Sequence, residues 1–384
     1  MNKICVYTIC KNEAQFVKKW LDSMEEADYI CVLDTGSTDG TFELLVQDPR
    51  VTKVEQKIID PWRFDVARNE SLKLVPEDTT IFICTDLDEI LHKGWAEPLR
   101  KKWNPDYHQR GHYQYIWSHT EDGKPGRIFR YDKIHSKDWI WKHPVHEMLV
   151  YTGDLPHEEL QNRNIIFWDE IVLEHFPDRT KSRGSYLPLL ELRAKESPDD
   201  YYGLFYLSHE YHYRGFYDKS IDLLNKILTE FADKYTTLEK AAAYLFLGDN
   251  WRRKGDKQRA LYFYHKGIEM EPTYRECYLN AAEVYNELKM YEAAVAFVEL
   301  AVKESYRHYT WVERDKSYGE QPEDILSIAY YYMAMRKSNW NNKGVLLCRA
   351  NEHMNNALKH NPNDKRLLYN KSFIDNELDA IMKK

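Results

Sequence analysis

The sequence has no long hydrophobic run, although 43% of its 384 residues are hydrophobic. No apolar stretch approaches the roughly 18 residues that a membrane-spanning helix needs. The first predicted strand already begins at Lys3, which leaves no room for a secretory signal peptide. We therefore expect a cytoplasmic protein without a membrane span.

Cysteine is also scarce, with six residues and no CxxC spacing, so a zinc site is not expected. Cys5, Cys31 and Cys84 lie inside predicted strands, where a reduced thiol behaves as a small hydrophobic side chain. Such cysteines fit a reducing compartment, in agreement with the expected cytoplasmic location.

The chain also has no excess of positive charge. The formal net charge is −8, and no run of Lys and Arg exceeds three residues. A nucleic-acid or anionic-membrane partner is therefore not expected. The length is sufficient for two hydrophobic cores, which makes two domains the default expectation.

The most informative segment that is present is an apolar strand followed by acids. The strand-forming residues Ile81–Cys84 lead directly into Asp86, Asp88 and Glu89. On an extended segment, the side chains of Asp86 and Asp88 would point the same way and could hold a hard divalent cation. The alternative is that these acids only keep the end of a strand hydrated.

Two upstream segments follow the same plan. An apolar strand over residues 3–10 precedes Asn12 and Glu13 and then a helical apolar stripe, and a second strand ends at Asp34. A turn rich in Gly, Ser and Thr follows Asp34, and a helix is predicted to start near Asp39 or Thr41. Alternating strands and helices predict a largely parallel sheet, whose ligands bind at the carboxyl ends of the strands. Asp34, Asp86 and Asp88 are thus expected to share one crevice.

Several motifs, in this order and spacing, resemble family-2 glycosyltransferases of the GT-A fold, which use nucleotide sugars. The resemblance covers roughly residues 3 to 190. It rests on Cys10-Lys11-Asn12-Glu13, Leu33-Asp34-Thr35-Gly36-Ser37-Thr38-Asp39-Gly40-Thr41, Ala67-Arg68-Asn69-Glu70-Ser71-Leu72, Asp86-Leu87-Asp88-Glu89, Arg127-Ile128-Phe129-Arg130, Pro144-Val145-His146-Glu147 and Glu174-His175-Phe176. With helical repeats behind it, the layout resembles the tetratricopeptide-bearing branch of that family, which includes peptide S-glycosyltransferases of the sublancin type.

The resemblance implies a set of residues around the donor nucleotide. Asp34 would hold the uracil or ribose, and Asp86 would face the ribose. Leu87, between the two aspartates on the extended segment, would point the opposite way, into the protein. Arg68 could pair with a phosphate or lock the Asp86 loop. The alternative for Asp34 is a helix-capping carboxylate. The complete set is Asn12, Glu13, Asp34, Arg68, Asp86 and Leu87.

A divalent metal, Mn²⁺ or Mg²⁺, is implied as the partner of the donor diphosphate. By resemblance Asp88 is a ligand and His175 completes the site, with His146 as a second histidine candidate. An ordinary hydrogen-bonded histidine is the alternative for each of the two.

Glu147 is the candidate general base of an inverting transfer, where a carboxylate deprotonates the attacking group. The family usually has Glu-Asp at this turn, whereas this chain has His146-Glu147. Further basic residues are candidate diphosphate partners or members of a solvated face; they are Arg127, Arg130, Lys181 and Arg183.

The second half of the chain has helical periodicity and internal repeats. Segments that begin at Gly215, Gly255 and Lys289 align as a turn followed by a second helix, and the last two are offset by 34 residues. Thirty-four residues is the tetratricopeptide period. We therefore predict an α/β, Rossmann-like GT-A domain over residues 1–190 and an all-α repeat domain over residues 191–384.

The leading hypothesis is a metal-dependent inverting glycosyltransferase that moves a sugar from a UDP-sugar to an acceptor. The resemblance favours a Cys, Ser or Thr side chain of a polypeptide as that acceptor. The repeats would bind that acceptor, another protein, or a second copy in a homodimer. Alternatives are a transferase that builds a glycan or lipopolysaccharide, a non-catalytic nucleotide-sugar-sensing scaffold, and a nucleotidyltransferase. The sequence lacks the early glycine-rich phosphate loop that nucleotidyltransferases usually carry, which argues against the last alternative.

Overall fold

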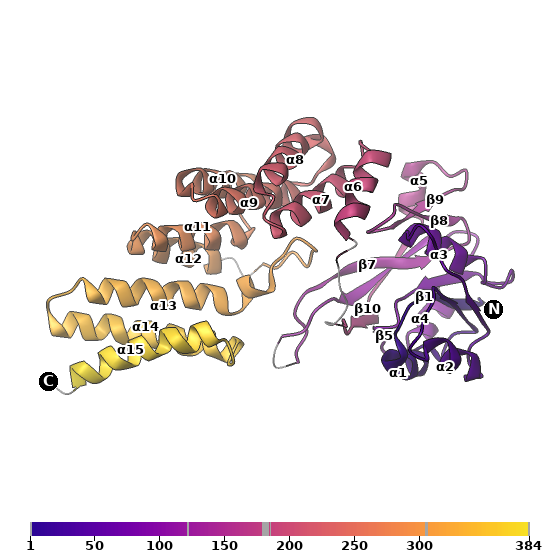
Figure 1. Cartoon of the computed structure of the whole chain (residues 1–384), viewed down its shortest axis with the longest axis horizontal. Helices are drawn as coiled ribbons and strands as arrows, with labels where there is room; N and C mark the ends of the chain where they lie inside the picture. The colour runs from indigo at the N-terminus through magenta and orange to yellow at the C-terminus, as the bar shows by residue number, and fades with distance from the viewer. Residues whose placement is uncertain (1, 121–122, 179–183, 185, 304–305, 383–384) are drawn as a thin grey trace. The chain divides into compact units, whose positions relative to one another are not determined.

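The computed structural model contains two compact units, which divide at Ser197 and Pro198 (Figure 1). The first unit is α/β and the second is helical, as the sequence predicts. No helix in the described residues is both long and apolar enough to cross a membrane. The structure describes residues 2–120, 123–178, 184, 186–303 and 306–382. Lys181 and Arg183 lie outside this part of the chain.

The first unit is built on a mostly parallel sheet. Among its described residues, the strand order is β3-β2-β1-β4-β7-β6-β10-β5, and β8 and β9 form a separate antiparallel hairpin. The strands are β1 (Ile4–Cys10), β2 (Tyr29–Asp34), β3 (Lys53–Gln56), β4 (Ile81–Cys84), β5 (Glu89–Leu91), β6 (Arg110–Ile116), β7 (Ile128–His135), β8 (Trp139–Lys142), β9 (Met148–Tyr151) and β10 (Asn164–His175).

The central strands β1, β2 and β4 run parallel, so their carboxyl ends meet at one edge. In the register of the sheet, Cys10 of β1 lies beside Asp34 of β2, and Tyr7 lies beside Cys84 of β4. The predicted parallel arrangement is therefore confirmed. The antiparallel strand β7 separates these strands from β6 and β10, which are parallel to each other.

Apolar layers cover both faces of the sheet. Val6 and Val32 pack into a cluster with Trp20 of α1, whereas Tyr7 on the opposite face packs with Trp141 of β8. This alternation follows from the two-residue period of a strand. The helical stripe predicted after β1 is confirmed, because α1 buries Val17, Trp20, Leu21 and Met24. The helices of the first unit are α1 (Ala14–Met24), α2 (Thr41–Gln47), α3 (Phe64–Leu72), α4 (Ala96–Lys102), α5 (His157–Asn162) and α6 (Tyr186–Glu196).

The segment from Asp86 to Asp88 is a turn, so the prediction of an extended segment was wrong. Strand β4 ends at Cys84, and the amide of Glu89 donates to the carbonyl of Asp86 at 3.1 Å. The chain turns here because β5 pairs antiparallel with β10, with Glu89 beside His175. Leu87 is fully buried, as expected, while the two aspartates have different partners.

The second unit consists of successive helix pairs followed by one more helix. The pairs are α7 (Tyr201–Tyr213) with α8 (Tyr217–Glu230), α9 (Thr237–Arg253) with α10 (Lys257–Met270), α11 (Arg275–Glu287) with α12 (Tyr291–Lys303), and α13 (Glu320–Met335) with α14 (Trp340–His360); α15 (Lys365–Met382) follows. Short 3₁₀ turns are η1 (Ala232–Lys234) and η2 (Asp315–Tyr318). The predicted helical repeats are thus confirmed.

The turns within the first three pairs share one backbone conformation. Gly215, Gly255 and Lys289 have positive φ values of 81°, 87° and 62°. Glycine adopts this conformation without steric strain, whereas Lys289 adopts it at a small energetic disadvantage. The small residues Ser220, Ala260 and Ala294 of the following helices are fully buried, which permits close helix crossing.

Candidate active site

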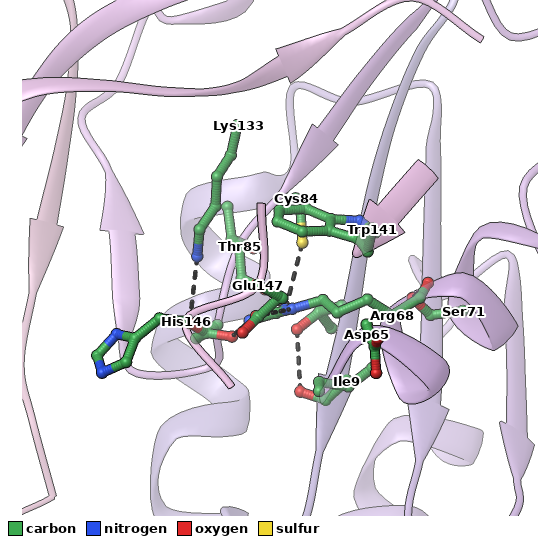
Figure 2. Close-up of polar contacts among 12 residues, drawn as sticks. Ile9, Asp65, Arg68, Ser71, Cys84, Thr85, Lys133, Trp141, His146 and Glu147 are labelled. Carbon is green, nitrogen blue, oxygen red and sulfur yellow. Dashed lines mark hydrogen bonds and ion pairs between the residues drawn. The ribbon is translucent and has the colours of Figure 1, made fainter. Parts of the chain in front are cut away.

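Arg68 on α3 is the centre of the site. Its guanidinium is almost completely buried and contacts two carboxylates, with Nη2 at 2.6 Å from Oδ1 of Asp86 and Nε at 2.9 Å from Oε1 of Glu147. Nη1 lies 3.2 Å from the thiol of Cys84 (Figure 2). Arg68 thus contacts the Asp86 turn through a single carboxylate oxygen, and its contact with a phosphate stays a prediction.

A second buried cation, Lys133 of β7, completes this charge network. Its Nζ lies 3.4 Å from Oδ2 of Asp86 and 3.9 Å from Oε1 of Glu89. Glu89 in turn accepts hydrogen bonds from the amide of Asp86 at 2.9 Å and from the hydroxyl of Tyr115 at 2.7 Å. The conformation of the Asp86 turn is therefore held by charge and hydrogen bonds from three strands.

Burial and charge act against each other on these groups. Burial alone would raise the pKa of Asp86, but the charges of Arg68 and Lys133 outweigh it and hold that pKa well below its usual range. Burial raises the pKa of Glu89, Lys133 opposes this, and Asp86 adds to it. Asp86 is thus a carboxylate at neutral pH, and its charge is already neutralised by the protein.

Asp88 faces a different partner, His175 at the end of β10. Oδ2 of Asp88 lies 3.4 Å from Nε2 of His175, and Nδ1 of that ring contacts the carbonyl of Trp117 at 3.1 Å. Burial would lower the pKa of His175, yet the contact with Asp88 outweighs this and raises it. The amide of Phe176 donates to the carbonyl of Asp88 at 2.7 Å, which joins the turn to β10.

The pair Asp88 and His175 has the chemistry of a partial metal site. With ligand distances of about 2.1 Å, neighbouring ligand atoms of an octahedral ion lie about 3.0 Å apart, close to the observed 3.4 Å. A carbonyl on the second ring nitrogen is the usual support for a metal-binding histidine. Within the described part of the chain, no three His, Cys, Asp or Glu side chains come together as a metal-binding group. The two residues therefore fit an ion whose other ligands come from a bound molecule or water.

His146 lies elsewhere on the loop before β9. Its side chain is exposed and its ring packs edge-on against Tyr186 of α6, at 5.8 Å between centroids. Figure 2 shows this ring pointing away from the Arg68 guanidinium. The contacts described for His146 are thus distinct from those of Asp88 and His175, and its role as a metal ligand stays a prediction.

Glu147 is positioned by elements on both sides of its loop. From α3, the side chain of Asn69 pairs with the main chain of Trp141 at 2.8 and 2.9 Å. From α6, the fully buried Arg193 donates to the carbonyls of Val145 at 3.0 Å and His146 at 2.7 Å. This support leaves the Glu147 carboxylate 11% exposed, with one oxygen on Arg68. Its other oxygen has no hydrogen bond among the described residues.

The two loops after β1 and β2 interlock. The fully buried Asp34 uses Oδ1 to accept from the amides of Gly36 at 2.9 Å and Ser37 at 2.8 Å. Asn12 accepts from the amide of Thr38 at 2.8 Å, and the amide of Glu13 donates to the hydroxyl of Thr41 at 2.8 Å. Asp34 therefore shapes the turn in this structure, and its direct contact with a nucleotide stays a prediction.

The remaining basic candidates are arranged around β7. Arg130 is exposed, whereas Arg127 is half-buried and lies over the ring of Trp117, at 4.8 Å from its centroid. Sequence reasoning missed Lys133, Tyr115 and Arg193. Lys133 follows the half-buried Tyr131 at strand spacing, but only the pairing of β7 with β4 brings it to Asp86.

Comparisons with known proteins agree with this arrangement. Residues 5–152 match the model of glycosyl transferase family 2. An 81-residue region is 33% identical to an uncharacterised protein of Methanocaldococcus jannaschii, and the match covers 21% of this chain and 94% of that protein. The narrower resemblance to peptide S-glycosyltransferases is not tested by these matches.

Structures similar to this chain include helical repeat proteins. A thermophilic TPR protein of Thermus thermophilus is 18% identical, with 49% of this chain and 88% of that chain covered and a TM-score of 0.36. MamA of Desulfovibrio magneticus is 16% identical, with 48% and 90% covered and a TM-score of 0.35. Such low scores add nothing to what the helix pairs themselves show. The family assignment therefore concerns the first unit: residues 5–152 form a glycosyl transferase family 2 domain.

Proposed function

We propose that this chain is a metal-dependent inverting glycosyltransferase that uses a UDP-sugar. The observation that carries the proposal is the turn at the carboxyl end of β4, which brings Asp86 to Arg68 of α3 and Asp88 to His175 of β10. Family membership supports a nucleotide-sugar donor and an acceptor.

In this proposal, Asp88 and His175 hold a divalent ion, and Asp86 faces the donor ribose. The ion would bind the diphosphate and neutralise the charge that builds up on the leaving group. Arg68 and Lys133 already balance two of the carboxyl groups among Asp86, Asp88, Glu89 and Glu147. With these four groups ionised and His175 neutral, as a metal ligand must be, the site is short of positive charge, which favours a divalent cation.

Glu147 has the role of general base. One carboxylate oxygen is oriented by Arg68, and the other is available to accept a proton from the attacking group. Arg193 and Asn69 restrain the loop, so the base would be held in one position before the acceptor arrives. The candidate acceptor is a Cys, Ser or Thr side chain of a polypeptide, and a thiol would need the least help from the base.

The metal site predicts that UDP binding depends on the ion and on Asp88. In calorimetric titrations, we expect UDP to bind at least about tenfold more tightly with Mn²⁺ than without it, and Asp88→Asn to remove most of that gain. Asp22→Asn is a matched control, because Asp22 is exposed on α1 and makes only surface ion pairs. Binding that ignores Mn²⁺, or that is unchanged in Asp88→Asn, would refute the metal site.

Donor and acceptor need separate measurements. Incubation with a panel of UDP-sugars should release UDP slowly even without an acceptor, whereas a non-catalytic scaffold would bind a UDP-sugar and release none. Mass spectrometry of polypeptides from cells that express the chain should then show hexose or N-acetylhexosamine additions on Cys, Ser or Thr. Sugar additions found only in glycans or lipopolysaccharide would contradict a polypeptide acceptor.

A further inference from the structure

A non-repetitive segment of the second unit lies against its first three helix pairs. The segment Tyr306–Tyr318, here called the strap, connects α12 to α13 and contains no α-helix or strand (Figure 1). It contacts α7, α9 and α11, the first helices of those pairs. We call their contacting surface, which carries Phe205, Phe246, Asp249, Tyr274 and Glu276, the strap-binding face.

An aromatic side chain is the first anchor of the strap. The ring of Trp311 lies 5.4 Å from Phe205 and 5.3 Å from Tyr206 of α7, measured between centroids. It also lies 6.3 Å from His209, which stacks on Phe246 of α9. The strap-binding face thus provides a site for one large aromatic ring.

A guanidinium three residues later is the second anchor. Nη2 of Arg314 lies 2.7 Å from Oδ2 of Asp249, and its guanidinium carbon lies 5.0 Å from the ring centroid of Phe246. Asp249 is held in place by the hydroxyl of Tyr264 at 2.8 Å and the amide of Asn280 at 2.7 Å. A fixed carboxylate beside an aromatic ring is a specific arrangement for arginine.

The main chain of the strap is bound as well. The hydroxyl of Tyr274 donates to the carbonyl of Val312 at 2.8 Å, and the amide of Arg314 donates to Oε1 of Glu276 at 3.0 Å. Within the strap, the buried Glu313 accepts from Nε of Arg307 at 3.2 Å. The strap is therefore recognised through side chains and backbone, as a peptide ligand would be.

The surface below the strap combines aromatic rings with buried polar groups, whereas the contacts between paired helices are mainly apolar. Asp249, Asn280 and Glu276 project from helices α9 and α11, whereas contacts between paired helices are made by residues such as Leu279, Ala294 and Val298. Among the described residues, Oε2 of Glu276 has no hydrogen-bond partner. Water could satisfy these polar groups if the strap left, whereas the rings of Phe205, Phe246 and Tyr274 would be uncovered and would favour a replacement that also carries an aromatic residue.

We infer that the strap is a displaceable intramolecular ligand, and that the strap-binding face accepts a polypeptide segment with an aromatic residue three positions before an arginine. While the strap is bound, this face is closed to other polypeptides. The inference does not depend on glycosyl transfer, because it concerns only the second unit and its occupant.

Binding in trans tests the inference. The full chain with Trp311→Ala/Arg314→Ala should bind a synthetic peptide of residues 306–318 at least about tenfold more tightly than the unmodified chain, measured by calorimetry. A peptide with both anchors changed to alanine should not bind. The matched control is Tyr306→Ala/Lys316→Ala, which changes an exposed aromatic and an exposed basic residue of the strap; it should behave like the unmodified chain.

Other outcomes would overturn the inference. If the double variant keeps its helical circular dichroism and does not bind the peptide, the strap-binding face is not a binding site for polypeptides. A double variant that fails to fold contradicts a displaceable strap. Equal binding of the peptide by the unmodified chain contradicts a strap that closes this face. Hydrogen exchange provides an independent measurement: the Arg314 amide of the unmodified chain should exchange through local opening, at least about tenfold faster than through global unfolding.

The strap should also open more readily as the pH rises. Burial raises the pKa of Glu276 to about 7 in the closed state, against about 4.3 for an exposed glutamate. The closed state holds the proton more tightly than the open state. The stability that this proton gives the closed state is complete below about pH 4.3, falls as the pH rises, and is lost once the pH has passed about 7. The titratable and charged groups that face Glu276 are Glu313, Arg314 and Tyr318 of the strap, Cys277 of α11, and Tyr274 directly before α11.

We expect the opening constant of the Arg314 amide, after division by its intrinsic exchange rate, to increase about tenfold between pH 6 and pH 8. Glu276→Gln removes the titrating group and should flatten this dependence. An opening constant that is independent of pH in the unmodified chain would show that Glu276 is not coupled to the strap.

Discussion

Replacing Glu147 by glutamine is expected to slow sugar transfer by about 10²–10⁴-fold at saturating donor. Glutamine keeps the shape of the side chain, and its Oε1 can still accept from Arg68 Nε, so the loop should stay in place. What is lost is the ability to take a proton from the acceptor. The rate is measured as UDP release in the presence of acceptor, or with the UDP-sugar alone until the acceptor is known.

The same variant should bind UDP and Mn²⁺ with unchanged affinity, because Asp88 and His175 contact each other rather than Glu147. Glu158→Gln on α5 is a suitable control, since Glu158 is an exposed glutamate of the same unit. If Glu147→Gln instead loses UDP affinity and keeps its turnover, Glu147 is a metal or structural ligand, and the base must be sought elsewhere.

Replacing Arg68 by methionine is expected to lower the free energy of unfolding by about 2–4 kcal/mol at pH 7, which is less than for a fully buried ion pair because the Asp86 side chain is 36% exposed. Methionine fills much of the space but leaves Asp86 and Glu147 without their shared guanidinium. The guanidinium is almost completely buried, so water cannot take over its role without rearrangement of the turn. Urea denaturation of the full chain, followed by circular dichroism, measures the loss, and the transition of the second unit serves as an internal reference.

The pH dependence of this loss has a definite sign. The pKa of Asp86 is depressed in the folded chain, so the stability from its contact with Arg68 is present above its unfolded pKa of about 3.9 and is lost as the pH falls. The difference between the two proteins should therefore shrink below about pH 4. Arg130→Met, at an exposed position of β7, should change stability by no more than about 0.5 kcal/mol. A loss below about 1 kcal/mol in Arg68→Met would mean that the network makes no net contribution.

Local patterns were sufficient to predict the parallel strands of the first unit. The apolar runs at β1, β2 and β4 each lead into a polar loop, and α1 carries the helical spacing of Val17, Trp20, Leu21 and Met24. These features depend on neighbours in sequence, so they can be recognised without a partner strand. The placement of β7 between β4 and β6 depends on pairing across about fifty residues and could not be recognised in this way.

Some residues of the candidate site were likewise predictable from sequence motifs, whereas others were revealed only by the structure. Asp86, Asp88, Glu147 and His175 came from motifs that resemble those of a family, and the structure brings Asp88 to His175 and joins Asp86 to Glu147 through Arg68. No pattern indicated that Lys133 would neutralise Asp86. The extended geometry expected for Asp86 and Asp88 was wrong, because antiparallel pairing of β5 with β10 requires a turn there.

In the second unit, the repeats were visible because their period is local, and Gly215, Gly255 and Lys289 indicated the turns between paired helices. The strap has no such period, and its role emerges only where Trp311 meets α7 and Arg314 meets Asp249 of α9.

The sequence by itself thus determined the order of the two units, their secondary structure and the motifs that carry the chemistry, because these depend on short-range patterns of apolar and polar residues. Only the tertiary structure decided which charges neutralise one another and what occupies the strap-binding face. Those contacts join residues far apart in the chain, and the free energy of burying a charge depends on partners that strand order and helix stacking bring to it.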